Sequence, residues 1–403
     1  MRILHICSGS SGGAAVAATR LAAAQSKMGD ETLIVDINFM KLNGRNITHT
    51  IRRKALSAIQ QIFTKKKFGV LTPHSYPYLK LKVINDFNPD VVHIHNWYNI
   101  LNYRLIDEIA QVYPIVFTLH DERLLTGGCH NTLGCGQNLS GCRNCPATHV
   151  MRKYIESDYH QKKNLFQNIP RYAIAAPSSW LTKKALESGI FANADRITQI
   201  SNIIEPIRLN FTESVSTGIE STDFRILFVA ADINVKLKGF EILAEAFYAL
   251  TKRDHNRKYV LTAVGASADE TKQINSNGKI LFKRPVNQTK LYELMSQNSF
   301  LVVPSLSENS PNIISEAQMN GVIVIASNVG GIPEMIENGV TGFLFQSEVD
   351  VLTKCLLEVQ NLKITQVETI RAEALKQSIK RHDSELITFR YEELYRSVQE
   401  SNV

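Results

Sequence analysis

Short apolar runs typical of strands alternate with helical runs along the whole sequence. In the first half, the runs expected to form buried parallel strands are 2–8, 31–37, 90–97, 114–121 and 172–180. In the second half they are 224–231, 258–265, 279–286, 299–305 and 322–327. Such runs are bounded by breakers and are apolar on both faces, as in sheets covered by helices on each side. The pattern therefore predicts an α/β fold.

A polar, turn-rich segment at 200–223 interrupts this alternation at mid-chain. We therefore expect two doubly wound domains, not one closed barrel. The predicted boundaries are 1–205 with a cysteine-rich insertion at 122–147, then 206–383, and a C-terminal helix at 384–403 that packs on the first domain. The last helices, 364–400, include SELITFRYEELYRSV, whose apolar spacing suits a helix that packs back across both domains. Ligands of open α/β sheets bind beyond the carboxyl ends of the strands, so two facing sheets would share one cleft.

Composition is ordinary for a globular protein, with 44% hydrophobic and 21% charged residues. No run approaches the roughly 18 apolar residues that a membrane span needs. The start, MRILHICSGSSGG, is interrupted too soon by Ser and Gly to be a signal h-region. We therefore expect a cytosolic protein.

Basic residues outnumber acidic ones by 45 to 38, and the excess is concentrated in the segment 51–71. This segment has six Lys and Arg, no acid, and apolar positions that could share one helix face. Such a helix can bind an anionic membrane surface, although a solvated helix over a core edge fits equally well. No RNA-recognition motif accompanies the charge, so nucleic acid is not an expected partner.

Small residues follow the first strand from Ser8 to Gly13, where the backbone can approach a ligand closely. The next helix, from about Ala14 to Gly29, would place amides at Gly12 and Gly13 for an oxyanion or hydroxyl. Tight packing of the strand against the helix is the alternative, because the segment lacks the full dinucleotide-binding pattern.

His120 and Asp121 end an apolar strand at the expected edge of the cleft. A lone histidine is more often a buried, satisfied side chain, but the end of a parallel strand favours a functional role. His93 and His95 share one face of their strand, and without a third ligand they are interpreted as structural.

Four of the six cysteines, Cys129, Cys135, Cys142 and Cys145, fall in one Gly-rich stretch that has no obvious core. Four thiolates around zinc would give such a stretch something to fold around. The terminal C-x2-C fits zinc well, whereas the C-x5-C spacing is looser than usual. Free thiols, disulfides and an iron–sulfur cluster remain alternatives, and His130 or His149 could replace one thiolate.

Two lysines, Lys236 and Lys238, follow a strand of the second half, where cations would suit a diphosphate. Further on, PSLSENSPNIISEAQMNG places Glu308 and Glu316 eight positions apart, the first just before a helical pattern. The positive end of that helix would suit a bound anion, so the two carboxylates at this spacing need a functional explanation.

The stretch from Pro304 to Phe345 resembles the donor-binding signature of retaining GT-B glycosyltransferases of family four, the glycosyl transferases group 1. Its marks are the Glu308/Glu316 pair, GGIPE at 330–334 and Thr341-Gly342. The resemblance extends to the Gly12-Gly13 loop, FTLHD with His120, PSSW at 177–180, Asn202 and Lys238-Gly239. The His120–Asp121 region and the cysteines are similar to a branch serving exopolysaccharide synthesis of the colanic-acid type.

The resemblance implies a GT-B fold and a metal-independent transferase with no catalytic cofactor. It implies catalytic roles for His120 at the transferred sugar, Lys238 at the leaving group and Glu308 at sugar hydroxyls. Glu316 would bind the ribose, and Gly12 and Asp121 would lie on the acceptor side. The remaining donor-binding positions are Gly13, Lys236, Arg284, Asn309, Ser310, Pro311, Asn312 and Ile313.

Two positions depart from the family's pattern. Asp232 stands where an Arg is usual, so Lys236 would have to supply the second cation. Phe282-Lys283-Arg284 replaces F-x-G, which leaves the choice between UDP and GDP open.

The function expected from these residues is transfer of a sugar from a nucleotide-sugar to a lipid-linked glycan. It would take place on the cytosolic face of a bacterial membrane, in synthesis of a surface polysaccharide. A sugar-nucleotide epimerase on the same fold and a degenerate partner subunit of a transferase are the alternatives.

Overall fold

The structure is a computed structural model. It describes residues 1–9, 12–36, 39, 79–98, 100–205, 223–253, 255, 257–267 and 272–400. The basic segment 51–71 and its expected membrane contact lie outside the described residues. Two compact units form, one from Met1–Ile203 with Asp383–Val403 and one from Ile204–His382. The sequence placed the corresponding boundaries at 205/206 and 383/384.

The first unit is built on a six-stranded, all-parallel sheet in the order β2-β1-β3-β4-β5-β6. Its strands are β1 (Arg2–Ile6), β2 (Glu31–Val35), β3 (Val91–Ile94), β4 (Ile115–Thr118), β5 (Tyr172–Ala176) and β6 (Arg196–Gln199). Its α-helices are α1 (Gly13–Lys27), α4 (Leu81–Phe87), α5 (Tyr103–Ala110), α6 (Arg152–Asn168), α7 (Ser179–Glu187) and α14 (Ser384–Glu400). Short 3-10 helices occupy Glu122–Leu125 and Gln137–Ser140.

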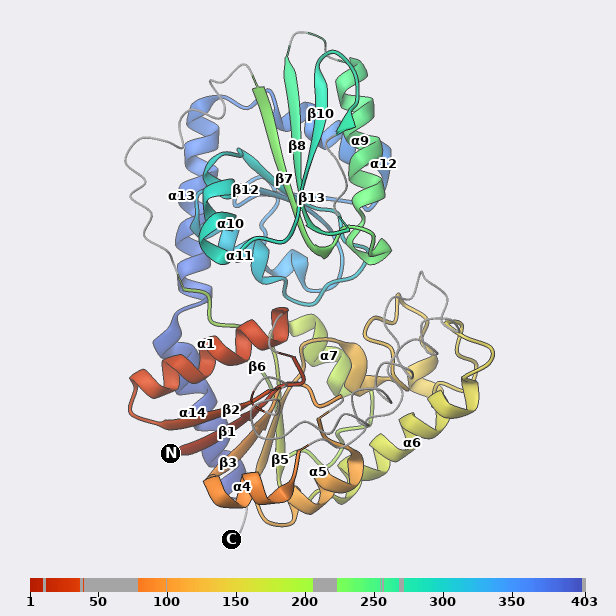
Figure 1. Cartoon of the computed structure of the whole chain (residues 1–403), viewed down its shortest axis with the longest axis vertical. Helices are drawn as coiled ribbons and strands as arrows, with labels where there is room; N and C mark the ends of the chain where they lie inside the picture. The colour runs from red at the N-terminus through yellow and green to blue at the C-terminus, as the bar shows by residue number, and fades with distance from the viewer. Residues whose placement is uncertain are drawn as a thin grey trace. The chain divides into compact units, whose positions relative to one another are not determined.

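The C-terminal helix α14 packs on the first unit, against α1, β4 and β5 (Figure 1). Its inward face, which includes Ile387, Leu394 and Val398, joins Ile3 and Val116 of the sheet in one buried cluster. The return of the chain's end to the N-terminal sheet was expected from the apolar spacing. The preceding helix, α13 (Ile364–Arg381), belongs to the second unit.

The second unit has a seven-stranded sheet in the order β13-β12-β11-β7-β8-β10-β9, in which only the pairing of β9 is antiparallel. The strands are β7 (Asp223–Asp232), β8 (Lys258–Ala266), β9 (Lys272–Gln273), β10 (Gly278–Lys283), β11 (Phe300–Val303), β12 (Ile323–Ser327) and β13 (Phe343–Phe345). The α-helices besides α13 are α9 (Phe240–Arg253), α10 (Gln288–Ser296), α11 (Asn312–Met319) and α12 (Val349–Val359). Short 3-10 helices occupy Lys236–Lys238 and Ile332–Glu334.

All ten expected strands are present, but most of them end earlier than predicted. The run 114–121, for example, is a strand only over Ile115–Thr118, and His120 and Asp121 lie beyond it. The apolar run extends past the last ladder hydrogen bond because the loop that follows is itself buried. The short strands β6, β9 and β13 were missed because they are too brief or too polar to form a clear run. Among the described residues, no helix has the length and apolar character needed to span a bilayer.

Candidate functional site

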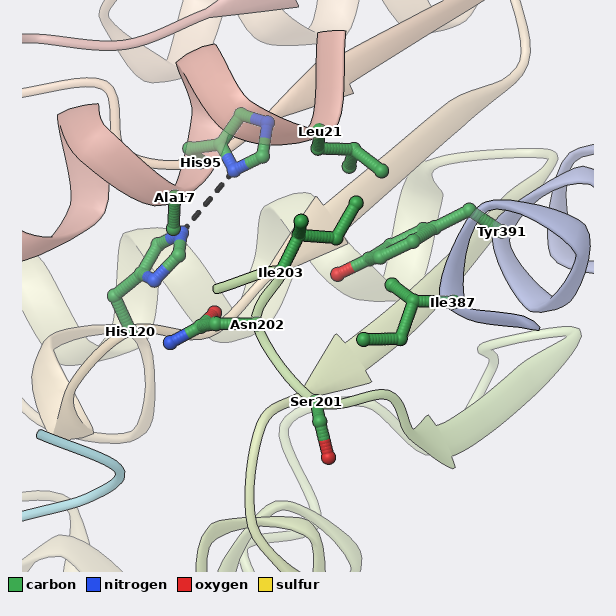
Figure 2. A pocket seen from close by; sticks show the side chains of 9 residues that line it. All are labelled: Ala17, Leu21, His95, His120, Ser201, Asn202, Ile203, Ile387 and Tyr391. Carbon is green, nitrogen blue, oxygen red and sulfur yellow. Dashed lines mark hydrogen bonds between the residues drawn. The ribbon is translucent and has the colours of Figure 1, made fainter. Parts of the chain in front are cut away.

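A pocket opens in the first unit where several parallel strands end (Figure 2). His95 follows β3, His120 follows β4, and Asn202 lies three residues beyond β6. Carboxyl ends of parallel strands are where α/β folds place ligands. The full lining is Ala17, Leu21, His95, His120, Ser201, Asn202, Ile203, Ile387 and Tyr391. Helix α14 thus contributes Ile387 and Tyr391 to a pocket whose other lining residues come from the N-terminal part of the chain.

His120, the histidine singled out by sequence, is linked to two more imidazoles and an amide. His120 Nε2 lies 3.1 Å from His95 Nδ1, a contact drawn in Figure 2. His95 Nε2 lies 3.1 Å from His5 Nδ1, and His5 Nε2 lies 2.8 Å from Gln25 Oε1. His5 comes from β1 and Gln25 from α1. The side chain expected to act on a sugar therefore sits at the end of a buried series of hydrogen bonds.

The series continues from Gln25 through α14 and back to the sheet. Gln25 Nε2 donates to the Tyr395 hydroxyl at 2.9 Å, and that hydroxyl lies 2.8 Å from His93 Nδ1. His93 Nε2 is 2.7 Å from Thr118 Oγ1, which is 3.0 Å from the Tyr391 hydroxyl. We call the eight side chains from His120 to Tyr391 the histidine network. Its last member, Tyr391, lines the same pocket as its first.

Burial keeps the imidazoles of the network neutral. Burial lowers the pKa of His5 to about 4, and the hydrogen bond with Gln25, which acts to raise the pKa, does not offset this effect. Burial likewise lowers the pKa of His120 to about 4, although the neighbouring Asp121 acts to raise it. The pKa values of His93 and His95 are held well below their usual range, mainly by burial and then by the neighbouring imidazoles. At neutral pH each ring therefore has one donor and one acceptor nitrogen.

The three imidazoles of His5, His93 and His95 place one nitrogen each within 4.8 Å of the others, the one such metal-ligand grouping among the described residues. Both nitrogens of every one of these rings already have hydrogen-bond partners. The cluster is therefore satisfied without a metal ion. His93 and His95 were interpreted as structural for want of a third ligand, and His5, on the adjacent strand, is the imidazole that sequence alone did not place beside them.

Asp121 is engaged with His130, not with the histidine network. Its Oδ2 lies 2.6 Å from His130 Nδ1, and its Oδ1 accepts a bond from the Arg123 amide at 2.8 Å. Burial acts to raise the pKa of Asp121, but His130 and this amide outweigh it, so the pKa is lowered. Gly12, at φ +91°, precedes α1, and Gly13 begins it; both are exposed. The expected acceptor-side residues Gly12 and Asp121 thus both lie in loops that follow strands.

In the second unit, Lys238 and Glu308 form an ion pair between side chains 70 positions apart in sequence. The Lys238 ammonium donates to Glu308 Oε1, which also accepts from the Ser305 hydroxyl at 3.3 Å. Lys238 ends the 3-10 turn after β7, and Glu308 lies in the loop after β11. These strands pair directly, so the two loops leave the same edge of the sheet.

Two glycines allow the backbone around this pair to approach closely. Gly330, at φ +58°, lies so near Glu308 that an added Cβ would meet the Glu308 carbonyl oxygen at 1.8 Å. The next amide, Gly331, donates to that carbonyl at 3.1 Å. Gly239, at φ +70°, approaches the Pro304 carbonyl in the same way, with 1.9 Å to an added Cβ. The GG turn and the Lys-Gly step therefore hold the Glu308 loop and Lys238 in position.

Helix α11 begins directly after this loop. Pro311 is its N-cap residue, and no side-chain hydrogen bond caps this end within the part of the chain that the structure describes. Asn309 and Glu316 are buried, whereas Ser310, Pro311, Asn312 and Ile313 are half-buried. The expected donor-binding residues 309–313 thus span the helix start, and Glu316 lies one turn inside it. Lys236 and Arg284, also expected to bind donor, are exposed after β7 and β10.

The four clustered cysteines all have free sulfurs, and Cys129, Cys142 and Cys145 are buried. Backbone amides donate to three of the sulfurs: Gly127 to Cys142 at 3.3 Å, Gln137 to Cys135, and Ala147 and Thr148 to Cys145. A hydrogen bond from the Cys129 thiol lowers the pKa of Cys145. These sulfurs do not form a three-ligand group within 4.8 Å among the described residues, and His130 is held by Asp121.

Residues 223–361 match the model of the family described as Glycosyl transferases group 1. The match runs from β7 through α12. An uncharacterized glycosyltransferase of Methanocaldococcus jannaschii is 31% identical over 160 residues, which are 37% of this chain and 40% of that protein. D-inositol 3-phosphate glycosyltransferase of Streptomyces scabiei is 42% identical over 67 residues, 17% and 15% of the two chains. The chain thus spans less than half the length of these curated relatives.

Solved structures resemble the chain over nearly its whole length. HepE of Anabaena, in complex with UDP-glucose, matches with a TM-score of 0.66 and 17% identity, over 98% of this chain and 100% of HepE. Sucrose-phosphate synthase from Thermosynechococcus elongatus matches with a TM-score of 0.66 and 14% identity over 100% of both chains. Two parallel sheets flanked by helices, as in these proteins, define the GT-B glycosyltransferase fold, and the expectation of this fold is confirmed.

Proposed function

We propose that this chain is a retaining glycosyltransferase that moves a sugar from a nucleotide-sugar to a glycan. The observation that carries the proposal is the Lys238–Glu308 pair, set between the β7 and β11 loops just before the start of α11. A cation and the amides of a helix start together suit a diphosphate. The match of this unit to the glycosyl transferases group 1 family, and a structural neighbour bound to UDP-glucose, support a nucleotide-sugar donor.

In this mechanism the diphosphate competes with Glu308 for the Lys238 ammonium. Amides from Asn309 to Ile313 hold the phosphates, Glu316 takes the ribose hydroxyls, and Glu308 turns to hydroxyls of the sugar. The bond from the anomeric carbon to the phosphate oxygen lengthens, and the acceptor hydroxyl enters on the same face. A new glycosidic bond forms while the acceptor's proton passes to the departing diphosphate. The residues thus supply a preorganised positive field, which is the larger part of such catalysis.

The first unit is proposed to serve the sugar and the acceptor. His120 would contact a hydroxyl of the transferred sugar, with Gly13 also on the donor side and Gly12 and Asp121 on the acceptor side. Lys236 and Arg284 would add contacts to the donor from the second unit. The acceptor would be a lipid-linked glycan of a bacterial surface polysaccharide, reached on the cytosolic face of the membrane through the basic segment 51–71.

Binding of the donor can be tested by thermal shift with UDP-glucose, UDP-galactose, GDP-mannose and their free nucleotides. A ligand that binds only the folded chain raises its melting temperature. Either the uridine or the guanosine compounds should therefore raise the melting temperature more than the other set. Hydrolysis of the preferred donor should then fall by about 10²-fold or more in Lys238→Ala and Glu308→Gln. In the proposed mechanism Lys238 stabilises the leaving diphosphate and Glu308 binds the sugar that is transferred. Lys290→Ala is the matched control, since Lys290 forms an exposed ion pair with Glu293 in the same unit.

The same assay separates the alternatives. An epimerase would convert the donor into its epimer and release no free sugar. A degenerate partner subunit would leave every donor intact and show no response to the Lys238 and Glu308 substitutions. Either result would contradict the proposed transferase.

A further inference from the structure

The histidine network has a direction, and one residue sets it. Neutral imidazoles and hydroxyls can each reverse their donor and acceptor roles, so most of the network is compatible with either direction. A primary amide cannot reverse without turning over, because its NH2 only donates and its oxygen only accepts. Gln25 is the single amide in the network. Its Oε1 faces His5 and its Nε2 faces the Tyr395 hydroxyl.

The arm from Gln25 to the pocket then follows from the chemistry of neutral imidazole. Because Gln25 Oε1 can only accept, His5 carries its proton on Nε2 and accepts at Nδ1. His95 must therefore donate from Nε2 to His5 and accept at its own Nδ1. The partner of His95 Nδ1 is His120 Nε2, which must donate. Three consecutive rings thus take the same tautomer, and the last of them lines the pocket.

The arm through α14 takes the complementary direction. The Tyr395 hydroxyl accepts from Gln25 Nε2, so its own proton goes to His93 Nδ1. His93 then donates from Nε2 to Thr118, and Thr118 donates to the Tyr391 hydroxyl. Each of the six members between His120 and Tyr391 donates once and accepts once along the series, the arrangement in which hydrogen bonds reinforce one another. Turning the Gln25 amide over would reverse both arms.

We propose that Gln25 is a positioning residue that fixes His120 as the tautomer with its proton on Nε2, leaving Nδ1 as the acceptor nitrogen of the ring. Gln25 acts from α1 through His5 and His95, without touching the pocket itself. The consequence for catalysis rests on the proposed function: His120 would accept a hydrogen bond from a sugar hydroxyl, and would not donate one. At the other end, Tyr391 keeps its own proton to donate.

Docking of α14 completes the network, because Tyr391 and Tyr395 lie one helical turn apart on that helix. A fully satisfied polar network inside a core fixes one arrangement, whereas a half-satisfied one is costly. The packing of α14 on the first sheet therefore has a second role besides the burial of apolar surface. It supplies the Tyr395 hydroxyl, which accepts from Gln25 Nε2 and joins the two arms through His93.

The direct test is the tautomer of each ring at pH 7, read from long-range 1H–15N correlations of the full chain labelled with 15N-histidine. Single His→Asn variants assign the signals. In the unaltered protein we expect His5, His93, His95 and His120 all neutral and all protonated on Nε2. A proton on Nδ1 of His120, or an imidazolium at any of the four rings, would overturn the proposal. No donor is present in this measurement, so it stands or fails independently of the transferase activity.

The role of Gln25 is tested with Gln25→Leu, which keeps the side chain's approximate size and removes both hydrogen-bonding groups. His120 should then give signals of both tautomers, because nothing sets the direction. With donor and acceptor supplied, kcat should fall about 5- to 10-fold with little change in KM for the donor, the cost of roughly one neutral hydrogen bond. Ser26→Ala, at the neighbouring position of α1, is the control and should change neither the tautomer signals of His120 nor kcat. A single, unaltered His120 tautomer in a folded Gln25→Leu protein would refute the role of Gln25, and the spectrum of the unaltered protein decides the tautomer even if that variant does not fold.

Discussion

His120 Nε2 and His95 Nδ1 lie 3.1 Å apart, so the histidine expected to act on substrate is held by one that sequence had set aside as structural. The contact places the ring of His120 in an uncharged series that extends to β1 and α14. Its reactivity is therefore a property of the folded core and not of the loop alone. The stability of the first unit should depend on the same uncharged state.

Lowering the pH should destabilise the first unit between about pH 6.5 and 4. Burial lowers the pKa of His5 to about 4 in the folded chain, while the unfolded imidazole titrates near 6.5. Within this window the unfolded state binds more protons, so stability falls as pH falls and levels off above 6.5. Each such imidazole contributes a slope of about 1.4 kcal/mol per pH unit. His120 adds to the slope, with Asp121 as the charged group that opposes its shift.

Both tryptophans, Trp97 and Trp180, lie in the first unit, so their fluorescence follows its unfolding in urea without a signal from the second. The free energy of unfolding at pH 5 should be at least a few kcal/mol below that at pH 7, and His5→Gln should flatten the slope. His149→Asn, in the loop before α6, serves as the control and should leave it unchanged. Equal stabilities at the two pH values would show that these rings are not kept neutral by the fold.

The order of the elements could be predicted from sequence, because it depends on local pattern. Ten apolar runs became strands, and the loops carrying Lys238 and Glu308 leave adjacent strands. Gln25, Tyr391 and Tyr395 could not have been found in this way. Gln25 is one of several polar residues on an alanine-rich helix, and its partner Tyr395 lies 370 positions away. Contacts of that kind depend on strand order and helix docking, which apolar periodicity does not encode.

Gly330→Ala should destabilise the second unit and lower donor binding. The new Cβ would meet the Glu308 carbonyl oxygen at 1.8 Å, and the residue would also be held at φ +58°. Relief requires the Gly330 turn and the Glu308 loop to move apart, which would disturb the position of Glu308 beside Lys238. The expected loss is on the order of 2 kcal/mol or more in unfolding free energy, measured by circular dichroism in urea.

Gly339→Ala is the matched control for this substitution. Gly339 also has a positive φ, +80°, but an added Cβ there meets nothing within 4 Å. Its cost should be about 1 kcal/mol from the backbone conformation alone, with the melting-temperature shift by donor unchanged. If the two variants behaved alike, the close approach of Gly330 to Glu308 would have no role in the donor site.

Lys162→Met should destabilise the region that leads into the cysteine-rich segment. The Lys162 ammonium is fully buried and donates to the carbonyls of Arg123 and Thr126, and it lies 3.4 Å from Asp158. Removing it leaves two buried carbonyls without their donor, at about 1–3 kcal/mol each, while Asp158 keeps its ion pair with Arg123 at 3.4 Å. Lys163→Met, at the next position of α6, should change stability by less than about 0.5 kcal/mol. Tryptophan fluorescence in urea compares the two, and equal losses would contradict the assigned contacts.

The cysteine-rich segment should bind one zinc ion per chain. A hydrogen bond from the Cys129 thiol, helped by backbone amides, lowers the pKa of Cys145 and favours its thiolate, the form that binds zinc. Burial raises the pKa values of Cys135 and Cys142, so a metal ion would have to displace their protons, and the four sulfurs must draw closer together to surround it. Metal analysis and thiol counting on protein purified without chelator should give about one zinc, with the four clustered thiols protected from modification until the metal is removed. Cys145→Ser should lose the metal, whereas Cys355→Ser, a cysteine of the second unit, should keep it. Four thiols that react freely in metal-poor protein would instead show that the segment folds around its hydrogen bonds alone.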